Sequence, residues 1–478
     1  MKNFFVILLW GMLIPCVSMA QNSLPVNFDE RTDLLSVVFR LAGNPEYNKC
    51  GISAYSQQVD EYFADYKQHQ VVTLAQQYVQ NSGISYDAVV AYAMHLVLPN
   101  KDNANIVFDT NFKKGGDDSF DRWSEEEKQE FLQSLNDFYQ KSQFHQWYES
   151  TRDIREEAIA SFNENIAKSI DLAWFNQFFG SIKNADFQIV LSLLVGPNNY
   201  GCSASLNNGV DKFAPVIGCA QIDSSGKVVY TNYNVILPIV IHEFCHGFCN
   251  PLNAQNWDGM KDKAESVFKL NAVKLAQMAY SNAETMMNET FVRSCVIRYI
   301  LDHHSGAKAD QLIKNENDFY LTSTLVESLT RYESSREKYA TMADYMPELV
   351  KDINAFDVKA FQKQQKQNQK LLGRVVKCSI KNRAKNVPAG KQTLVIQFSK
   401  PMVPGIALGY GASDGQFLDF EAALRNSFSW SNDRRTISIY LDLKPDTHYA
   451  FSILGDYFQT EDGHPLDKTT FIDFWTKK

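Results

Sequence analysis

The chain is poor in the residues that mark several classes of protein. It has only 8 cysteines and 14 prolines in 478 residues, and the cysteines are widely scattered. This spacing excludes a small fold held together by disulfides. The formal charge is −8 and no basic run is present, so nucleic acid and anionic membrane surfaces are poor partners. There is also no solenoid repeat and no long low-complexity segment.

The overall composition is that of a globular protein, and the N-terminus is typical of a secreted protein. With 45% hydrophobic and 21% charged residues, a chain of this length predicts two or three domains. Lys2, the apolar segment from Phe4 to Pro15 and the small residues before Ala20 predict a signal peptide over residues 1–20. A lipoprotein anchored through Cys16 is the alternative. No later stretch has the apolar length of a membrane span, so we expect an exported protein, periplasmic or extracellular, without a transmembrane span.

The most informative segment reads H-E-x-x-H. His242 and His246 are four residues apart, so on a helix they lie on one face, one turn from each other, and can hold one metal ion. Glu243 lies next to them, where it can act on water at the metal. Pro238 suits the first turn of a helix, and Asn250-Pro251 predicts that the helix ends soon after the motif.

A catalytic zinc site needs a third protein ligand and keeps one position for water. Glu289 is the best candidate, because it lies in an apolar helix where an acid is costly to bury without a partner or a metal. Arg293, one turn later, can pair with Glu289 and orient it. Glu284, His303 and His304 are weaker candidates, because each is at a helix end that suits its charge without any metal.

The motif followed by Asn288-Glu289 on a later helix resembles the gluzincin zinc metallopeptidases. The resemblance implies a zincin-like domain with Zn2+ as cofactor and Glu243 as general base. It implies three zinc ligands, His242, His246 and Glu289. The chain departs from some gluzincins in having Arg293 where they carry an Asp.

Peptide hydrolysis also needs a group that stabilises the tetrahedral intermediate. In gluzincins this group is usually a Tyr or His downstream of the third ligand. Tyr332 is our first candidate for this catalytic role, and Tyr320, Tyr339 and His304 are the alternatives. A tyrosine on a helix is more often a core residue, so Tyr332 has a competing structural interpretation.

A broader resemblance covers most of the helical region. The opening Glu30–Gly43, the His242 motif with Asn250-Pro251 behind it, and then Tyr332 and Tyr339 look like an uncharacterised secreted bacterial family, domain of unknown function 4932. This resemblance implies a peptidase. The tail is similar to a bacterial immunoglobulin-like module of the surface-layer type, and three segments carry this likeness: 398–402, 443–449 and 474–476.

The pattern along the chain predicts a multidomain α+β protein. Residues 21–370 form a mostly helical, zincin-like domain, with a helical part over 21–180 and a catalytic part over 181–370. Apolar residues at 187–195, then 214–222 and 227–230, predict a small β-sheet just before the motif. Segments 261–280, 283–303 and 320–341 are expected to be helices. Residues 371–478 are expected to form an all-β, immunoglobulin-like sandwich with strands at 375–380, 393–398, 436–441, 449–453 and 470–475.

Two smaller expectations concern the central segment. The strand at 187–195 either binds an extended peptide along its edge or is a buried core strand, and we favour the second. Cys202 and Cys219 either pair or are buried free thiols, while Cys245 and Cys249 pack on a helix face away from the two histidines.

Three functions fit these patterns. The first is a secreted zinc-dependent metallopeptidase acting on a peptide or protein substrate. The second is a zinc hydrolase of a non-peptide amide or ester. The third is an exported binding or adhesion protein, in which the metal is structural and the sandwich contacts a surface or a glycan.

Overall fold

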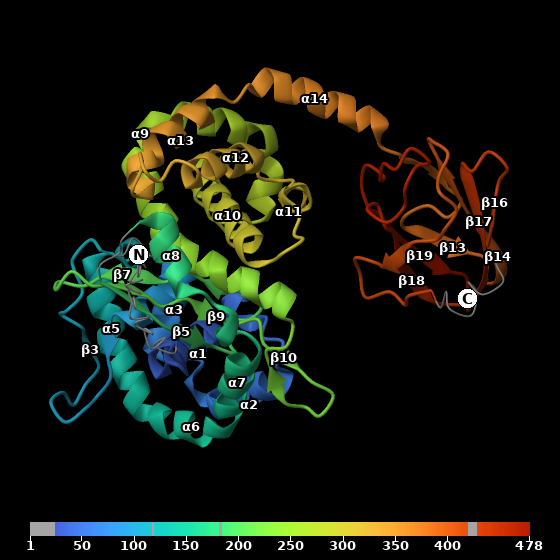
Figure 1. Cartoon of the computed structure of the whole chain (residues 1–478). Helices are drawn as coiled ribbons and strands as arrows, with labels where there is room; N and C mark the ends of the chain where they lie inside the picture. The colour runs from blue at the N-terminus through green and yellow to red at the C-terminus, as the bar shows by residue number, and fades with distance from the viewer. Residues whose placement is uncertain (1–23, 117–118, 181–183, 419–427) are drawn as a thin grey trace, which may run out of the picture. The chain divides into compact units, whose positions relative to one another are not determined.

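The computed structural model describes residues 24–116, 119–180, 184–418 and 428–478. The predicted signal peptide, with Cys16, lies outside the described residues. The chain divides into two compact units, Met1–Phe356 and Asp357–Lys478, here called unit 1 and unit 2. Unit 1 combines helices with small sheets and unit 2 is mainly β, so the mixed α and β class is confirmed (Figure 1).

The N-terminal part of unit 1 packs its helices around aromatic side chains. Trp123 lies 4.5 Å from Tyr92 and 5.1 Å from Phe131, measured between ring centroids. Helix α5 begins with a capping box, in which the side chains of Ser124 and Glu127 accept hydrogen bonds from each other's backbone N–H. The helices of this part are α1 (Glu30–Leu41), α2 (Ser53–Tyr62), α3 (Gln70–Ser82), α4 (Asp87–Met94), α5 (Glu125–Lys141), α6 (Phe144–Ser150), α7 (Arg152–Asn165) and α8 (Leu172–Phe179).

Two small sheets lie between these helices and the rest of unit 1. The first has the order β1-β5-β9-β6, with β1, β5 and β9 parallel and β6 antiparallel at one edge. Its strands are β1 (Val26–Phe28), β5 (Ile189–Leu191), β9 (Val216–Ile217) and β6 (Asn199–Tyr200). The second has the order β4-β8-β7, with strands β4 (Ala185–Phe187), β8 (Asp211–Phe213) and β7 (Ser203–Ser205). Two short pairs complete the β structure, β2 (Leu96–Val97) with β3 (Val107–Phe108), and β10 (Gln221–Ile222) with β11 (Val228–Val229).

The strand expected at 187–195 is divided between these two sheets. Its first residue ends β4, and residues 189–191 form β5. Because β5 pairs with β1 on one side and β9 on the other, it has no open edge for a peptide. The interpretation as a buried core strand is therefore confirmed.

Helix α9 (Tyr233–Gln277) carries the H-E-x-x-H motif and continues far beyond it. The prediction that it ends at Asn250-Pro251 is wrong, although a non-helical residue, Asn271, interrupts it near its end. Pro251 removes one backbone hydrogen bond, the one to the carbonyl of Gly247. Packing of α9 against α10 (Ala283–His303) and α13 (Met342–Ala355) stabilises it across that defect.

The remaining helices of unit 1 are α11 (Ala309–Asn315) and α12 (Thr322–Glu333). The predicted helix at 283–303 has the bounds of α10, and its N-cap is Asn282. Helix α9 has the length and hydropathy of a membrane span, with 50% of its apolar window buried inside the protein. Its packing against α10 and α13 is that of a core helix. The Cys249 and Cys295 thiols lie 3.7 Å apart in the α9–α10 contact, and the seven cysteines of the described residues are free.

Unit 2 begins with the exposed helix α14 (Val358–Leu371), which the sequence assigned to the helical domain. Two four-stranded sheets follow and share one apolar core, with side chains such as Leu394 and Ile439 from one sheet and Phe451 and Phe474 from the other. The strands of the first sheet, in order, are β12 (Val375–Cys378), β14 (Gly390–Phe398), β17 (Thr436–Leu443) and β16 (Phe428–Trp430). Those of the second are β13 (Ala384–Val387), β19 (Thr470–Thr476), β18 (His448–Ile453) and β15 (Leu408–Tyr410).

Candidate metal centre

Three side chains that can bind a metal converge where α9 meets α10. The Nε2 atoms of His242 and His246 lie 3.1 Å apart. Glu289 reaches them from α10, with Oε2 at 3.5 Å from His242 Nε2 and Oε1 at 3.3 Å from His246 Nε2. All three side chains are largely buried, with 18%, 16% and 9% of their surface exposed. The ligand set expected from the sequence is thus brought together.

These distances fit a small divalent ion. Zinc binds histidine nitrogen and carboxylate oxygen at about 2.1 Å, so tetrahedral ligands are about 3.4 Å from one another. The observed separations of 3.1, 3.3 and 3.5 Å lie around that value. Two imidazoles and one carboxylate also form a donor set typical of catalytic zinc, with three protein ligands rather than four.

Close backbone contacts fix the position of the motif helix. A Cβ at Gly201, which follows β6, would lie 2.7 Å from the backbone oxygen of Glu243 and 2.8 Å from the Cβ of His246. A Cβ at Gly247 would lie 2.6 Å from the ring of Phe213 on β8. Only glycine lets both sheets approach α9 this closely, so the sheets hold the face that carries the histidines.

A second group of side chains orients the ligands. His246 Nδ1 lies 3.3 Å from Asn250 Oδ1, one turn along α9, which directs Nε2 toward the cluster. Arg293 Nε donates to Glu289 Oε2 at 3.2 Å, and this is the pairing that the sequence predicts. The same guanidinium donates to Glu316 Oε2 at 2.7 Å, so one cation connects the carboxylate ligand to the residue that follows α11.

Burial and charge determine the protonation of the cluster. Burial lowers the pKa of His242 to about 3, so its imidazole is neutral and ready to donate a lone pair. Burial also disfavours a charged His246, but Glu289 outweighs it and raises the pKa of His246 to about 9. Burial disfavours the charged form of Glu289, but the two histidines outweigh burial and hold the pKa of Glu289 below its ordinary value. A divalent cation bound here would displace the proton from His246.

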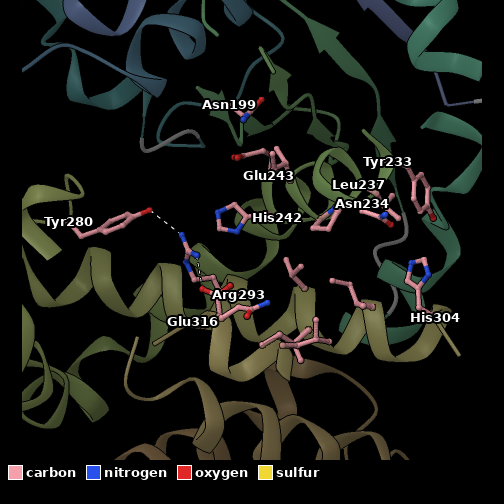
Figure 2. A pocket seen from close by; sticks show the side chains of 17 residues that line it. Asn199, Tyr233, Asn234, Leu237, His242, Glu243, Tyr280, Arg293, His304 and Glu316 are labelled. Atoms are coloured by element: carbon pink, nitrogen blue, oxygen red, sulfur yellow. Dashed lines mark hydrogen bonds and ion pairs between the residues drawn. The ribbon is translucent and has the colours of Figure 1, made fainter. Parts of the chain in front are cut away.

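The cluster borders a cavity of about 590 Å³. His242 and Glu243 line it from α9, and Arg293 lines it from α10. Figure 2 shows Glu243 on one side of the His242 ring and the Arg293–Glu316 pair on the other. Burial raises the pKa of Glu243 to about 7. A group that accepts protons near neutral pH thus lies in the same cavity as the ligand His242.

The other candidates for the third ligand lie elsewhere. Glu284 is exposed in the first turn of α10, where the helix dipole favours an acid. His303 contacts Asp171 at 3.1 Å and stacks on Tyr299. His304 lines the cavity at the end opposite Tyr280, with His242 between the two (Figure 2).

Tyr332 does not lie at the cluster, so its proposed catalytic role is corrected. Its side chain is fully buried, and its hydroxyl donates to the backbone oxygen of Phe178 at 2.7 Å. Tyr339 donates to Glu348, and neither Tyr339 nor Tyr320 is among the residues that line the cavity. The structural interpretation of Tyr332 as a core residue is the one that the contacts support.

Tyr280 is the cavity tyrosine that sequence reasoning missed. It lies in the connection between α9 and α10, nine positions before Glu289, whereas the search for a tyrosine considered only the downstream helices. Arg293 NH2 lies 3.4 Å from its hydroxyl oxygen, and Figure 2 shows the side chain pointing at that guanidinium. Burial raises the pKa of Tyr280 to about 12, so the phenol keeps its proton. The sequence placed Tyr280 at the end of the helix expected over 261–280, and no local pattern marked it as a residue of the site.

Fold and site together define a mixed α and β protein with a buried His-His-Glu cluster at the contact of two helices. The chain belongs to the family described as Domain of unknown function (DUF4932), whose profile matches residues 46–352. This confirms the family resemblance inferred from the sequence, and the matched region contains the whole cluster.

Other comparisons add little. No curated protein matches the chain in sequence. Among solved structures, the S-layer protein rSbsC(31-844) is 13% identical, over 48% of this chain and 33% of that one, with a TM-score of 0.15. The N-terminal part of the bacterial S-layer protein SbsC is also 13% identical, over 48% of this chain and 57% of that one, with a TM-score of 0.15. The chain thus spans a third to just over half of these proteins.

Proposed function

We propose that this protein is a zinc-dependent peptidase of the gluzincin type. The observation that carries the proposal is that three ligand atoms have zinc-like spacing, and that one of the ligands, His242, lines a cavity together with Glu243. His242, His246 and Glu289 would hold the ion. Zinc, when bound, supplies a Lewis acid that makes water more acidic and polarises a carbonyl.

The protein's own groups would move the protons and stabilise charge. Glu243 lines the cavity beside His242 and is placed to take a proton from the attacking water and pass it to the leaving amine. Tyr280 replaces Tyr332 as our candidate for the group that stabilises the tetrahedral intermediate. Its hydroxyl accepts from Arg293 and lines the cavity, where it is placed to donate to an oxygen that becomes negative.

The openness of the cluster favours catalysis over a structural metal. Structural zinc sites are closed by four protein ligands, whereas this cluster has three and borders a cavity. A peptide substrate is favoured over a small amide or ester because β6 is an edge strand and its residue Asn199 lines the same cavity. An extended peptide can add to such an edge through its backbone.

Two finer assignments belong to the same proposal. We take the shared core of the two sheets in unit 2 as support for an immunoglobulin-like module that acts as a spacer or contacts a surface. Export through the predicted signal peptide would place the peptidase outside the cytoplasm, where such a module has partners to contact.

Metal content and cleavage of peptides test the proposal together. The purified protein should contain about one zinc per chain, and this metal should be lost in His242→Ala. Glu243→Gln should keep the zinc and the fold but lower peptide cleavage by roughly 100-fold or more. Glu284→Gln, an exposed acid on α10, is the matched control and should change neither. A folded protein that binds no divalent metal would leave only the binding function.

A further inference from the structure

The cavity at the cluster continues as an apolar groove along α10. The residues 293, 296, 297, 300 and 304 all line it, and this spacing places them on one face of the helix. We call the apolar part the α10 groove. Its side chains are Leu237 from α9, Val296, Ile297 and Ile300 from α10, and Leu312 from α11.

The length of the groove fits a short segment of extended peptide. Residue 293 lies at the metal end and residue 304 at the far end. Eleven residues of α-helix rise about 16 Å. An extended chain advances about 3.3 Å per residue, so the groove accommodates about five residues.

Charge is confined to the ends of the groove. Arg293 and Glu316 lie at the metal end and pair with each other. Arg293 also pairs with Glu289. Among the described residues that line the cavity, no charged side chain lies on α10 between Arg293 and His304. A charged group placed there would lose water without gaining a partner, which is strongly unfavourable.

Backbone-like hydrogen-bonding groups border this apolar surface. The amides of Asn199, Asn234 and Asn315 line the same cavity, so a peptide backbone finds donors and acceptors along a route with apolar walls. A lipid chain could use the apolar walls but not these amides. The combination therefore favours a peptide as the occupant.

We infer that the α10 groove selects peptide substrates with large apolar side chains beside the bond that is cleaved. This inference rests on the proposed peptidase function and adds the class of substrate. Leu, Ile, Phe and Met side chains would bury surface against Ile300 and Leu312, the half-buried walls of the groove, whereas Asp, Glu or Lys would be excluded.

A digest of an unbiased peptide library by the zinc-loaded full chain, read by mass spectrometry, tests the inference. Apolar residues should be enriched next to the cleaved bonds, and charged residues there should lower kcat/KM about tenfold or more. Ile300→Lys should lower cleavage of apolar peptides about tenfold and raise cleavage of matched peptides with Asp or Glu. Ile300 is only half-buried, so the protein can accept the change.

Two further variants make the result decisive. Val273→Lys adds the same charge at a position of α9 that is 78% exposed, and it should leave the profile unchanged. Leu312→Lys, at a second half-buried wall position, should shift the profile as Ile300→Lys does. Zinc content and circular dichroism establish that each variant is folded.

The outcomes separate the two proposals. A zinc-loaded protein that cleaves no peptide in the library overturns the proposed function, and the inference with it. Cleavage without an apolar preference overturns the inference alone. A cleavage profile that is unchanged in Ile300→Lys and Leu312→Lys also overturns the inference. The same holds if a fatty acid competes with apolar peptides for the groove and the peptides are cleaved without selectivity.

Discussion

Arg293 connects more of the site than any other single side chain described here. Its guanidinium donates to Glu289 and Glu316, lies 3.4 Å from the Tyr280 hydroxyl, and stacks over the Phe319 ring at 4.4 Å from its centroid. Because four groups from three segments share one rigid planar cation, their positions are coupled. The position of the ligand Glu289 is therefore tied to residues beyond α10.

The contrast between two tyrosines gives the first prediction. Tyr280→Phe should lower kcat about 10-fold to 100-fold with little change in KM, because the hydroxyl acts on charge that develops only in the transition state. Tyr332→Phe should leave kcat unchanged and destabilise the fold by about 1 kcal/mol, since it removes a buried hydrogen bond to Phe178. Steady-state kinetics and urea unfolding measure both. Equal kinetic losses in the two variants would contradict the assignment.

Asp33 gives a prediction about pH. It is buried, Oδ1 accepts from Ser192 at 3.1 Å, and Oδ2 has no partner among the described residues. Burial raises its pKa from the ordinary 3.8 to about 7, despite the attraction of Arg155. The folded chain thus binds this proton more tightly than the unfolded chain. The contribution of this bound proton to the free energy of unfolding is present at low pH and is lost as the pH rises through 7.

Asp33→Asn, which carries no charge at any pH, should remove this dependence. The variant should gain stability relative to the natural protein between pH 5 and pH 8, by roughly 2 to 3 kcal/mol. Urea unfolding at the two pH values measures the difference. Asp102→Asn, an exposed acid, is the control and should show no such change. A constant difference between Asp33→Asn and the natural protein would show that the carboxyl ionises normally.

The sequence revealed the ligands because their chemistry leaves a local signature. His242 and His246 have helical spacing, and Glu289 is an acid among apolar residues, whose burial requires a partner. Tyr280 has no comparable signature. It lies in a connection between helices, and only the packing of α9 on α10 brings it to the cavity.

Helix α9 shows how tertiary contacts change the bounds of an element. A local rule ends a helix near Asn250-Pro251, but α9 continues because its neighbours supply packing on both sides of the proline. By contrast, the bounds of α10 were predicted correctly, and this helix begins with the capping side chain of Asn282. The short strands β13, β15 and β16 were missed, since three or four residues carry too little alternation.

Gly201 gives a prediction about the contact between a sheet and the motif helix. A side chain there would meet backbone and Cβ atoms of α9 below 3.0 Å, and these cannot rotate away. Gly201→Ala should therefore push α9 outward, lower the free energy of unfolding by about 1 to 3 kcal/mol and weaken zinc binding. Gly51→Ala, which meets no atom within 4 Å, should change neither quantity. Zinc competition titrations and urea unfolding measure the two effects. Unchanged zinc affinity in a folded Gly201→Ala protein would contradict the role of this contact.

At the scale of the whole molecule, the metal site belongs to one unit only. The cluster and its cavity lie in unit 1, and unit 2 has its own core. Calorimetry of the full chain should therefore show two unfolding transitions. Zinc added to the metal-free protein should raise the temperature of one by several degrees and leave the other unchanged, because a ligand stabilises only the part that binds it. A single transition that shifts as a whole would show that the units unfold together.

The general class of the chain was accessible from its apolar periodicities, which extend over hundreds of residues. Its family was accessible from the resemblance carried by Glu30–Gly43, the His242 motif, Tyr332 and Tyr339. The division into units was less accessible. The polar helix α14 continues the helical pattern, yet it belongs to unit 2, and sequence composition alone does not record where one compact unit ends and the next begins.

The cluster is built from two helices that remain packed through Asn253, Asn288 and the buried thiols, none of which needs an ion. The empty and loaded forms should therefore share one architecture, and the ion should act as a reversible occupant rather than as a folding nucleus. Where divalent ions are scarce, such a protein would be folded, metal-free and inactive. Activity would then follow the supply of metal within the time of diffusion.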